Sequence, residues 1–113
     1  MTIRINGKTI EIDNEGFLLD PEDWSMDVAK HIACIESLEL NEDRLEIVHF
    51  VRNFFEESHV VPEARTLLKA LREVHGKERA TRKYVYNLFP YGYGQQACKI
   101  AGMRKPLKLM LDI

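Results

Sequence analysis

The stretch LNEDRLEIVHFVRNFFEESHVVPEARTLLKALREVHG, residues 40–76, predicts two amphipathic helices joined by a short turn. Asn41 is a favoured N-cap residue, and the two acids after it suit the positive end of a helix dipole. Pro62 opens the second helix, and Gly76 stands where a glycine commonly follows a helix C-terminus. Apolar residues recur at helical spacing at Ile47, Val48, Val51, Phe54 and Phe55 in the first helix, and at Ala64, Leu67, Leu68, Leu71 and Val74 in the second.

The residues before this pair predict a β-hairpin and one more helix. Apolar and polar side chains alternate between Thr2 and Asp13, and Asn6-Gly7 interrupts them with the residues that a two-residue hairpin turn prefers. Asp20 and Ser25 are both N-cap candidates. A helix is expected to follow, running roughly from Ser25 to Glu36.

The residues after the pair predict two shorter helices. Residues 80–89 form the first of them, which Pro90 ends. The aromatic and glycine residues 91–94 predict a flexible turn, and residues 95–101 form a two-turn helix that ends at Gly102.

We therefore expect one domain of 113 residues, a length too short for two full domains. The fold class is α+β, mainly α: a small N-terminal β-hairpin, a bundle of about five helices that includes a helix-turn-helix-like pair, and an extended C-terminal arm. The hairpin and its lead-in occupy residues 1–19, the helical body 20–102 and the arm 103–113. In the arm, apolar residues alternate as in a strand that covers the protein's own core or adds to a partner, at Leu107, Leu109, Leu111 and Ile113.

The net charge of −2 conceals an uneven distribution. Residues 1–60 carry 14 acids and 5 bases, a net of −9, whereas residues 61–113 carry 4 acids and 11 bases, a net of +7. The basic half, with Arg65, Lys69 and Arg72 in the helix-turn-helix-like pair, is compatible with DNA binding. Alternatively, the bases complement the acids of the first half within the fold or contact an acidic partner. We rank nucleic acid below a protein partner, because any helical hairpin gives this outline and the total charge is slightly acidic.

Two sequence features bear on where the protein works. The longest apolar stretches are too short to cross a bilayer, so no membrane partner is expected. The start MTIRINGKTI lacks the apolar region of a secretory signal, which favours a cytoplasmic protein.

The two cysteines are the main candidates for chemistry. Without CxxC or CxxH spacing they predict neither a disulfide framework nor a zinc site, and we expect no metal or cofactor. Cys98 is followed by Lys99, Arg104 and Lys105, and nearby cations stabilise the reactive thiolate. The alternative is that Cys98 is a small apolar residue packed in the core, and the local spacing leaves both open. Cys34, in an apolar run, is expected to be structural.

Five segments resemble the DsrC/TusE family of small sulfur-relay proteins, which includes the gamma subunit of dissimilatory sulfite reductase. They are GFLLDPEDWS (16–25), LNEDRLEIVHFVRNFF (40–55), VPEARTLLKAL (61–71), KYVYNLFP (83–90) and QACKIAGMRKP (96–106). The resemblance implies a mostly helical domain with a small hairpin and a C-terminal arm that enters a partner's active-site channel. It also implies a penultimate arm cysteine in members that carry sulfur. Members that work with sulfite reductase have a second cysteine eleven residues upstream, whereas TusE-type members, which pass sulfur toward tRNA thiolation, keep only the penultimate one.

In this chain Cys98 matches the upstream cysteine, so the resemblance carries a thiol role onto it. Leu109 stands eleven residues later, and the penultimate residue is Asp112. Eleven extended residues span at most about 36–40 Å, a reach that Cys98 lacks because it is anchored in a helix.

We therefore interpret the protein as a non-carrier or regulatory DsrC/TusE-like variant, a monomer or weak homodimer. Its expected partner is a sulfite-reductase-like enzyme or a sulfur-relay protein. Two alternatives stay open. One is a sulfurtransferase component that carries persulfide on Cys98, and the other is a helix-turn-helix DNA-binding regulator.

Overall fold

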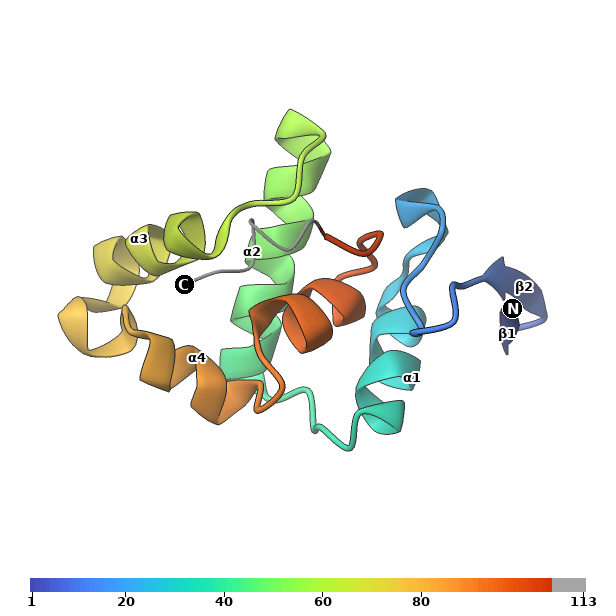
Figure 1. Cartoon of the computed structure of the whole chain (residues 1–113), viewed down its shortest axis with the longest axis horizontal. Helices are drawn as coiled ribbons and strands as arrows, with labels where there is room; N and C mark the ends of the chain where they lie inside the picture. Colours follow the sequence, from blue (N-terminus) through green and yellow to red (C-terminus); the bar gives the residue numbers. More distant parts are fainter. Residues whose placement is uncertain (107–113) are drawn as a thin grey trace.

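Helices dominate the computed structural model, which describes residues 1–106 (Figure 1). The predicted α+β architecture, mainly α with an N-terminal hairpin, is confirmed. In chain order the elements are β1 (Thr2–Ile5), β2 (Lys8–Glu11), the short 3-10 helix η1 (Pro21–Asp23), α1 (Met26–Ile35), α2 (Glu42–Ser58), α3 (Ala64–His75), the 3-10 helix η2 (Lys77–Arg79), α4 (Arg82–Leu88) and the π-helical segment η3 (Tyr93–Cys98).

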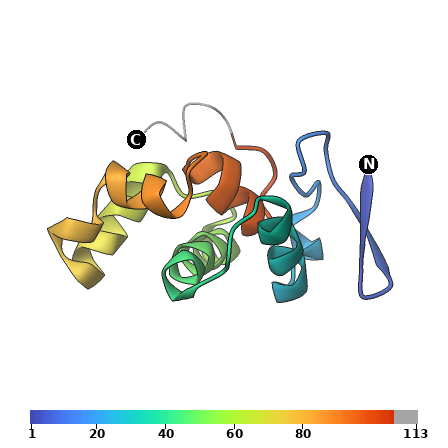
Figure 2. The same cartoon turned by 90° about the horizontal axis from the view of Figure 1, so that it is seen from below.

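The hairpin forms as the sequence predicts. Strands β1 and β2 pair antiparallel, with Ile3 opposite Ile10 and Ile5 opposite Lys8. Asn6 and Gly7 both adopt positive φ angles, 52° and 80°, which is the backbone geometry of a type I′ turn. The hairpin lies at one end of the molecule, beside α1 (Figure 2).

Side-chain caps set the helix starts. The Ser25 hydroxyl accepts from the Val28 N–H at 3.2 Å, and the Asn41 side chain accepts from the Arg44 N–H at 2.9 Å. Each of these bonds satisfies an N–H that has no partner within its helix. The boundaries of α1 and α2 therefore agree with the prediction, whereas α3 begins at Ala64, two residues after the predicted proline.

Helix α2 lies at the centre of the body, and η3 packs against it (Figures 1 and 2). Apolar side chains from the hairpin, the helices and the turn after η3 form one buried cluster. Its fully enclosed members include Leu18, Val28, Ala29, Ile47, Val48, Val51, Ala64, Val85, Phe89, Ala97, Cys98, Ile100, Ala101 and Met103.

The predicted flexible turn at residues 91–94 is wrong in its second half. Gly92, with φ of 96°, is the turn, and the helix begins directly after it at Tyr93. Tyr93 is only 2% exposed, and its hydroxyl donates to the Pro62 carbonyl oxygen at 2.6 Å. Burial of this large ring against a distant segment overrides the local turn signal of two nearby glycines.

Two expectations concern the surroundings of this body. Across residues 1–106, no helix has both the length and the apolar composition that a bilayer crossing requires. The strand expected at Leu107, Leu109, Leu111 and Ile113 lies outside the described residues.

Candidate functional site

Cys98 lies in the core, on the segment η3. Its side chain is fully buried, as the packing alternative expects. Burial raises the pKa of the Cys98 thiol to about 12, and a side-chain hydrogen bond with Tyr93 acts in the opposite direction. In this environment the thiol is protonated at neutral pH, whereas sulfur transfer requires the thiolate.

Two of the three cations that follow Cys98 in sequence, Lys99 and Lys105, pair with carboxylates away from the thiol. Lys99 Nζ lies 3.5 Å from a Glu36 carboxylate oxygen and 5.0 Å from the centre of the Phe17 ring. Lys105 forms an ion pair with Glu15. Burial and Tyr93, rather than these cations, determine the pKa of the thiol.

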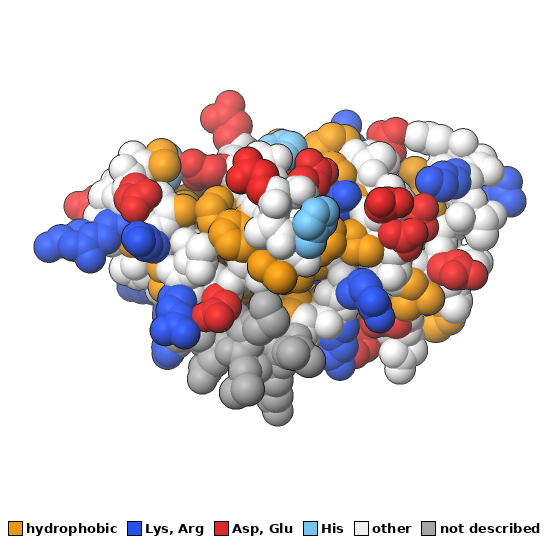
Figure 3. Space-filling view, turned by 90° about the horizontal axis from the view of Figure 1, so that it is seen from above, with side chains coloured by type: hydrophobic (Ala, Val, Ile, Leu, Met, Phe, Trp, Pro, Cys, Tyr) orange, Lys and Arg blue, Asp and Glu red, His pale blue; other side chains and the backbone are white. Residues whose placement is uncertain are grey.

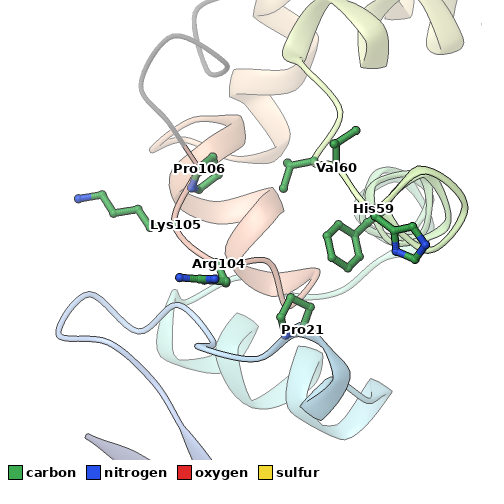
Figure 4. A pocket seen from close by; sticks show the side chains of 8 residues that line it. Pro21, His59, Val60, Arg104, Lys105 and Pro106 are labelled. Atoms are coloured by element: carbon green, nitrogen blue, oxygen red, sulfur yellow. The ribbon is translucent and has the colours of Figure 1, made fainter.

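Arg104, the third of these cations, is exposed and lines a groove at the base of the C-terminal arm. The groove encloses about 460 Å³, and in Figure 4 Lys105 points away from it. Its walls come from α2 and the following turn, from η1 and from the arm: Pro21, Phe55, His59, Val60, Val61, Arg104, Lys105 and Pro106. The groove combines an apolar floor with a basic side, a composition suited to a protein partner.

Cys34 is exposed, so its expected structural role is wrong. In the run from Ile32 to Ile35, helical geometry turns Ile32 and Ala33 inward, with exposures of 3% and 2%, and leaves Ile35 64% exposed. Cys34 falls on the outer side with Ile35. The spacing of the buried α1 residues could have shown this, because they follow an i, i+1, i+4, i+5 pattern that excludes position 34.

The end of the Cys98 helix is closed by a Schellman motif. Helical geometry continues from η3 through residues 99–100, and Gly102 follows with φ of 78°. The Gly102 N–H donates to the Lys99 carbonyl at 3.0 Å, and the Met103 N–H donates to the Cys98 carbonyl at 3.1 Å. The motif turns the chain out of the helix and into the arm.

Side chains from two other elements bind the remaining carbonyls. The Trp24 indole N–H donates to the Ile100 carbonyl at 2.8 Å, and an Arg52 guanidinium N–H donates to the Ala101 carbonyl at 3.3 Å. The four carbonyls at the end of the helix, which ordinarily lack helical partners, are therefore all hydrogen-bonded. The sequence analysis did not predict this role of Arg52. The sequence signal for it is a charged residue next to Val51 on the apolar face of α2.

Basic side chains gather at the end of the molecule formed by α3 and η2 (Figure 3). Arg65, Lys69 and Arg72 are exposed along α3, at helical spacing, and Arg65 Nε pairs with Glu63 at 2.9 Å. These are the residues considered for DNA binding. Within residues 1–106, no three His, Cys, Asp or Glu side chains are arranged to hold a metal ion.

The buried thiol predicts that stability falls at alkaline pH. The ordinary pKa of 9.0 applies to Cys98 in the unfolded chain, and about 12 applies in the folded one. Between these values the unfolded chain has lost a proton that the folded chain keeps, so the free energy of unfolding falls by up to about 1.4 kcal/mol per pH unit. Urea unfolding between about pH 8 and 10 measures this slope. Burial also raises the pKa of Tyr93, whose effect has the same sign and begins above its ordinary 10.0.

The matched variants are Cys98→Ala, which removes the buried thiol, and Cys34→Ala, which removes the exposed one. We expect the decline between about pH 9 and 10 to flatten in Cys98→Ala and to persist in Cys34→Ala. An unchanged slope in Cys98→Ala would contradict the assignment.

A family model described as "DsrC like protein" matches residues 4–110, almost the whole chain. The chain belongs to the DsrC-like family. Its relatives include a protein named "Sulfurtransferase TusE homolog" from Haemophilus influenzae, 40% identical over 108 residues, which cover 96% of this chain and 99% of the relative. A protein named "Sulfurtransferase TusE" from Pectobacterium atrosepticum is 42% identical over 106 residues, 94% of this chain and 97% of the relative.

Solved structures of DsrC-like proteins share the fold. The solution structure of Allochromatium vinosum DsrC superposes with a TM-score of 0.84 at 42% identity, covering 94% of this chain and 95% of that one. The oxidized gamma subunit of dissimilatory sulfite reductase from Archaeoglobus fulgidus gives a TM-score of 0.83 at 31% identity, covering 95% and 97%. The expected family membership is confirmed.

Proposed function

We propose that this protein is a DsrC-like binding protein of sulfur metabolism that does not itself carry sulfur. The observation that carries the proposal is the state of its thiols. Cys98 is fully buried with a raised pKa, and Leu109 occupies the position of the distal arm cysteine in the family pattern. Sulfur transfer needs a thiolate that is accessible to solvent, whereas the Cys98 thiol is buried and is protonated at neutral pH.

The proposed partner is a sulfite-reductase-like enzyme or a sulfur-relay protein. The names of the related proteins, TusE sulfurtransferases and a sulfite reductase gamma subunit, support this class of partner. The groove at the arm base supports a protein-binding role, because the hydrophobic Val60 is 54% exposed within it and Arg104 lies on its rim. In this function the protein occupies a partner site without delivering sulfur, and so acts as a regulator.

Incubation with a persulfide donor, followed by intact mass measurement, tests the absence of carrier activity. We expect no species one sulfur atom heavier that depends on Cys98. Any sulfur gained by the folded protein should disappear in Cys34→Ser and remain in Cys98→Ser, because Cys34 is the exposed thiol. Leu109→Cys provides the positive control, since it restores the distal cysteine of the family pattern.

The alternative, persulfide carried on Cys98, predicts the reverse result. In that case the heavier species would persist in Cys34→Ser, would be lost in Cys98→Ser, and would pass its sulfur to an acceptor protein. That outcome would overturn the non-carrier proposal.

A further inference from the structure

Arg52 holds a position that few arginines occupy. Its residue is 8% exposed, and its guanidinium lies 4.9 Å from the centre of the Trp24 ring while its Nε pairs with Glu56 at 3.1 Å. Its Nη1 donates to the Ala101 carbonyl. A charge this buried is tolerated only when it is paired and hydrogen-bonded, so these three contacts fix the guanidinium in one place.

Trp24 completes the same arrangement from the other side. It follows η1, its indole N–H binds the Ile100 carbonyl, and its ring lies against Gly102. The two side chains thus connect the start of α1 and the middle of α2 to consecutive carbonyls at the end of the Cys98 helix. Directly after these carbonyls, the chain turns at Gly102 toward the arm.

We propose that Trp24 and Arg52 are positioning residues that set the direction in which the C-terminal arm leaves the body. A Schellman turn alone fixes two carbonyls, whereas the carbonyls of Ile100 and Ala101 have a defined orientation through Trp24 and Arg52. Without them, the last turn of the helix can fray, and the exit angle of the arm varies. The geometric part of this inference stands alone; its consequence for partner binding rests on the proposed function.

The arm base supports this role because it continues along a defined path. Met103 is fully buried, Lys105 pairs with Glu15 on the loop after β2, and Pro106 lines the groove beside Val60. Small rotations at the carbonyls of residues 100 and 101 would carry all of these positions away from their contacts. Trp24 and Arg52 bind the carbonyls of Ile100 and Ala101. These two residues precede Met103, Lys105 and Pro106 in the chain, so their orientation affects the contacts of the arm base.

Distance measurement between two spin labels tests the inference. The exposed Cys34 provides one site, Arg104→Cys provides the other, and the buried Cys98 stays unlabelled, which the mass of the labelled protein verifies. We expect one narrow distance distribution with Trp24 and Arg52 present. Arg52→Met and Trp24→Phe, each of which removes a donor and keeps most of the apolar volume, should broaden or shift it.

Arg44→Met is the matched control. Arg44 also lies on α2 and also donates to backbone carbonyls, those of Leu88 at 2.7 Å and Glu39 at 2.9 Å, but it does not touch the arm exit. This variant should lower the melting temperature and leave the distance between residues 34 and 104 unchanged. If Arg52→Met unfolds the protein, the milder Trp24→Phe still gives the answer.

If the distance distribution between positions 34 and 104 is unchanged in folded Trp24→Phe and Arg52→Met, the inference is overturned. A lowered melting temperature without a change in this distance would then show that the two residues only stabilise the fold. With a dissimilatory sulfite reductase as the probe, a broadened distribution should accompany a loss of affinity. If the distance distribution broadens in the variants but the unsubstituted protein does not bind the sulfite reductase, the result counts against the proposed function and leaves the positioning role intact.

Discussion

Gly102→Ala should destabilise the protein by about 2–5 kcal/mol, the sum of two effects. The φ of 78° places Gly102 in the left-handed region, which costs a residue with a Cβ about 1–2 kcal/mol. The added Cβ would also lie 2.3 Å from Trp24 Cδ1, and relieving such overpacking in a core costs about 1–3 kcal/mol. Urea unfolding of the variant and the unsubstituted protein measures the difference.

Gly7→Ala separates the two effects. Gly7, in the type I′ turn of the hairpin, has a similar φ of 80°, but a Cβ at this position would meet no atom within 4 Å. This variant should therefore show the backbone cost alone, about 1–2 kcal/mol. Equal losses at positions 7 and 102 would mean that the close approach of Trp24 to the arm exit contributes nothing.

Thiol-specific reagents should modify Cys34 and spare Cys98 in the folded protein. A rise in pKa from 9.0 to about 12 lowers the thiolate fraction of Cys98 by about a thousandfold, since each pKa unit is a factor of ten. Full burial slows the reaction further. A colorimetric disulfide reagent near pH 8 releases one coloured thiolate for each protein thiol that reacts. We expect one equivalent per chain to be released quickly from the native protein, and two equivalents per chain in urea.

Single substitutions assign the two equivalents. Cys34→Ser should show almost no fast reaction when folded, and Cys98→Ser should react like the unsubstituted protein. A fast native reaction that survives in Cys34→Ser would show that Cys98 reaches solvent, and it would remove the main support for the non-carrier proposal.

The parts of the fold that sequence reasoning predicted are those whose causes are local. Asn6-Gly7 specifies a turn with two positive φ angles, and Ser25 and Asn41 cap the helices that directly follow them. Each signal and its structural effect lie within a few residues, so one sequence suffices to find them. The family resemblance added the expected role of the C-terminal arm.

The candidate site could not be predicted in the same way, because its contacts are distant in sequence. Trp24 binds a carbonyl 76 positions later, and Arg52 binds one 49 positions later. Lys99 is adjacent to Cys98 in the chain, yet it points to Glu36 on another helix end. The position of Cys98 beside cations in the sequence suggested a stabilised thiolate, whereas in the fold the thiol lies in the core, Lys99 and Lys105 pair with carboxylates, and Arg104 lines the groove.

The Met103 N–H donates to the Cys98 carbonyl, so the fold uses the backbone of residue 98, whereas sulfur chemistry would use its side chain. The Schellman turn uses the backbone of this residue, and the enclosed space around its side chain selects for small volume. Serine preserves the carbonyl and nearly the same volume, and alanine preserves the carbonyl and removes only the Sγ atom. Substitutions at position 98 can therefore report on sulfur chemistry without also moving the arm.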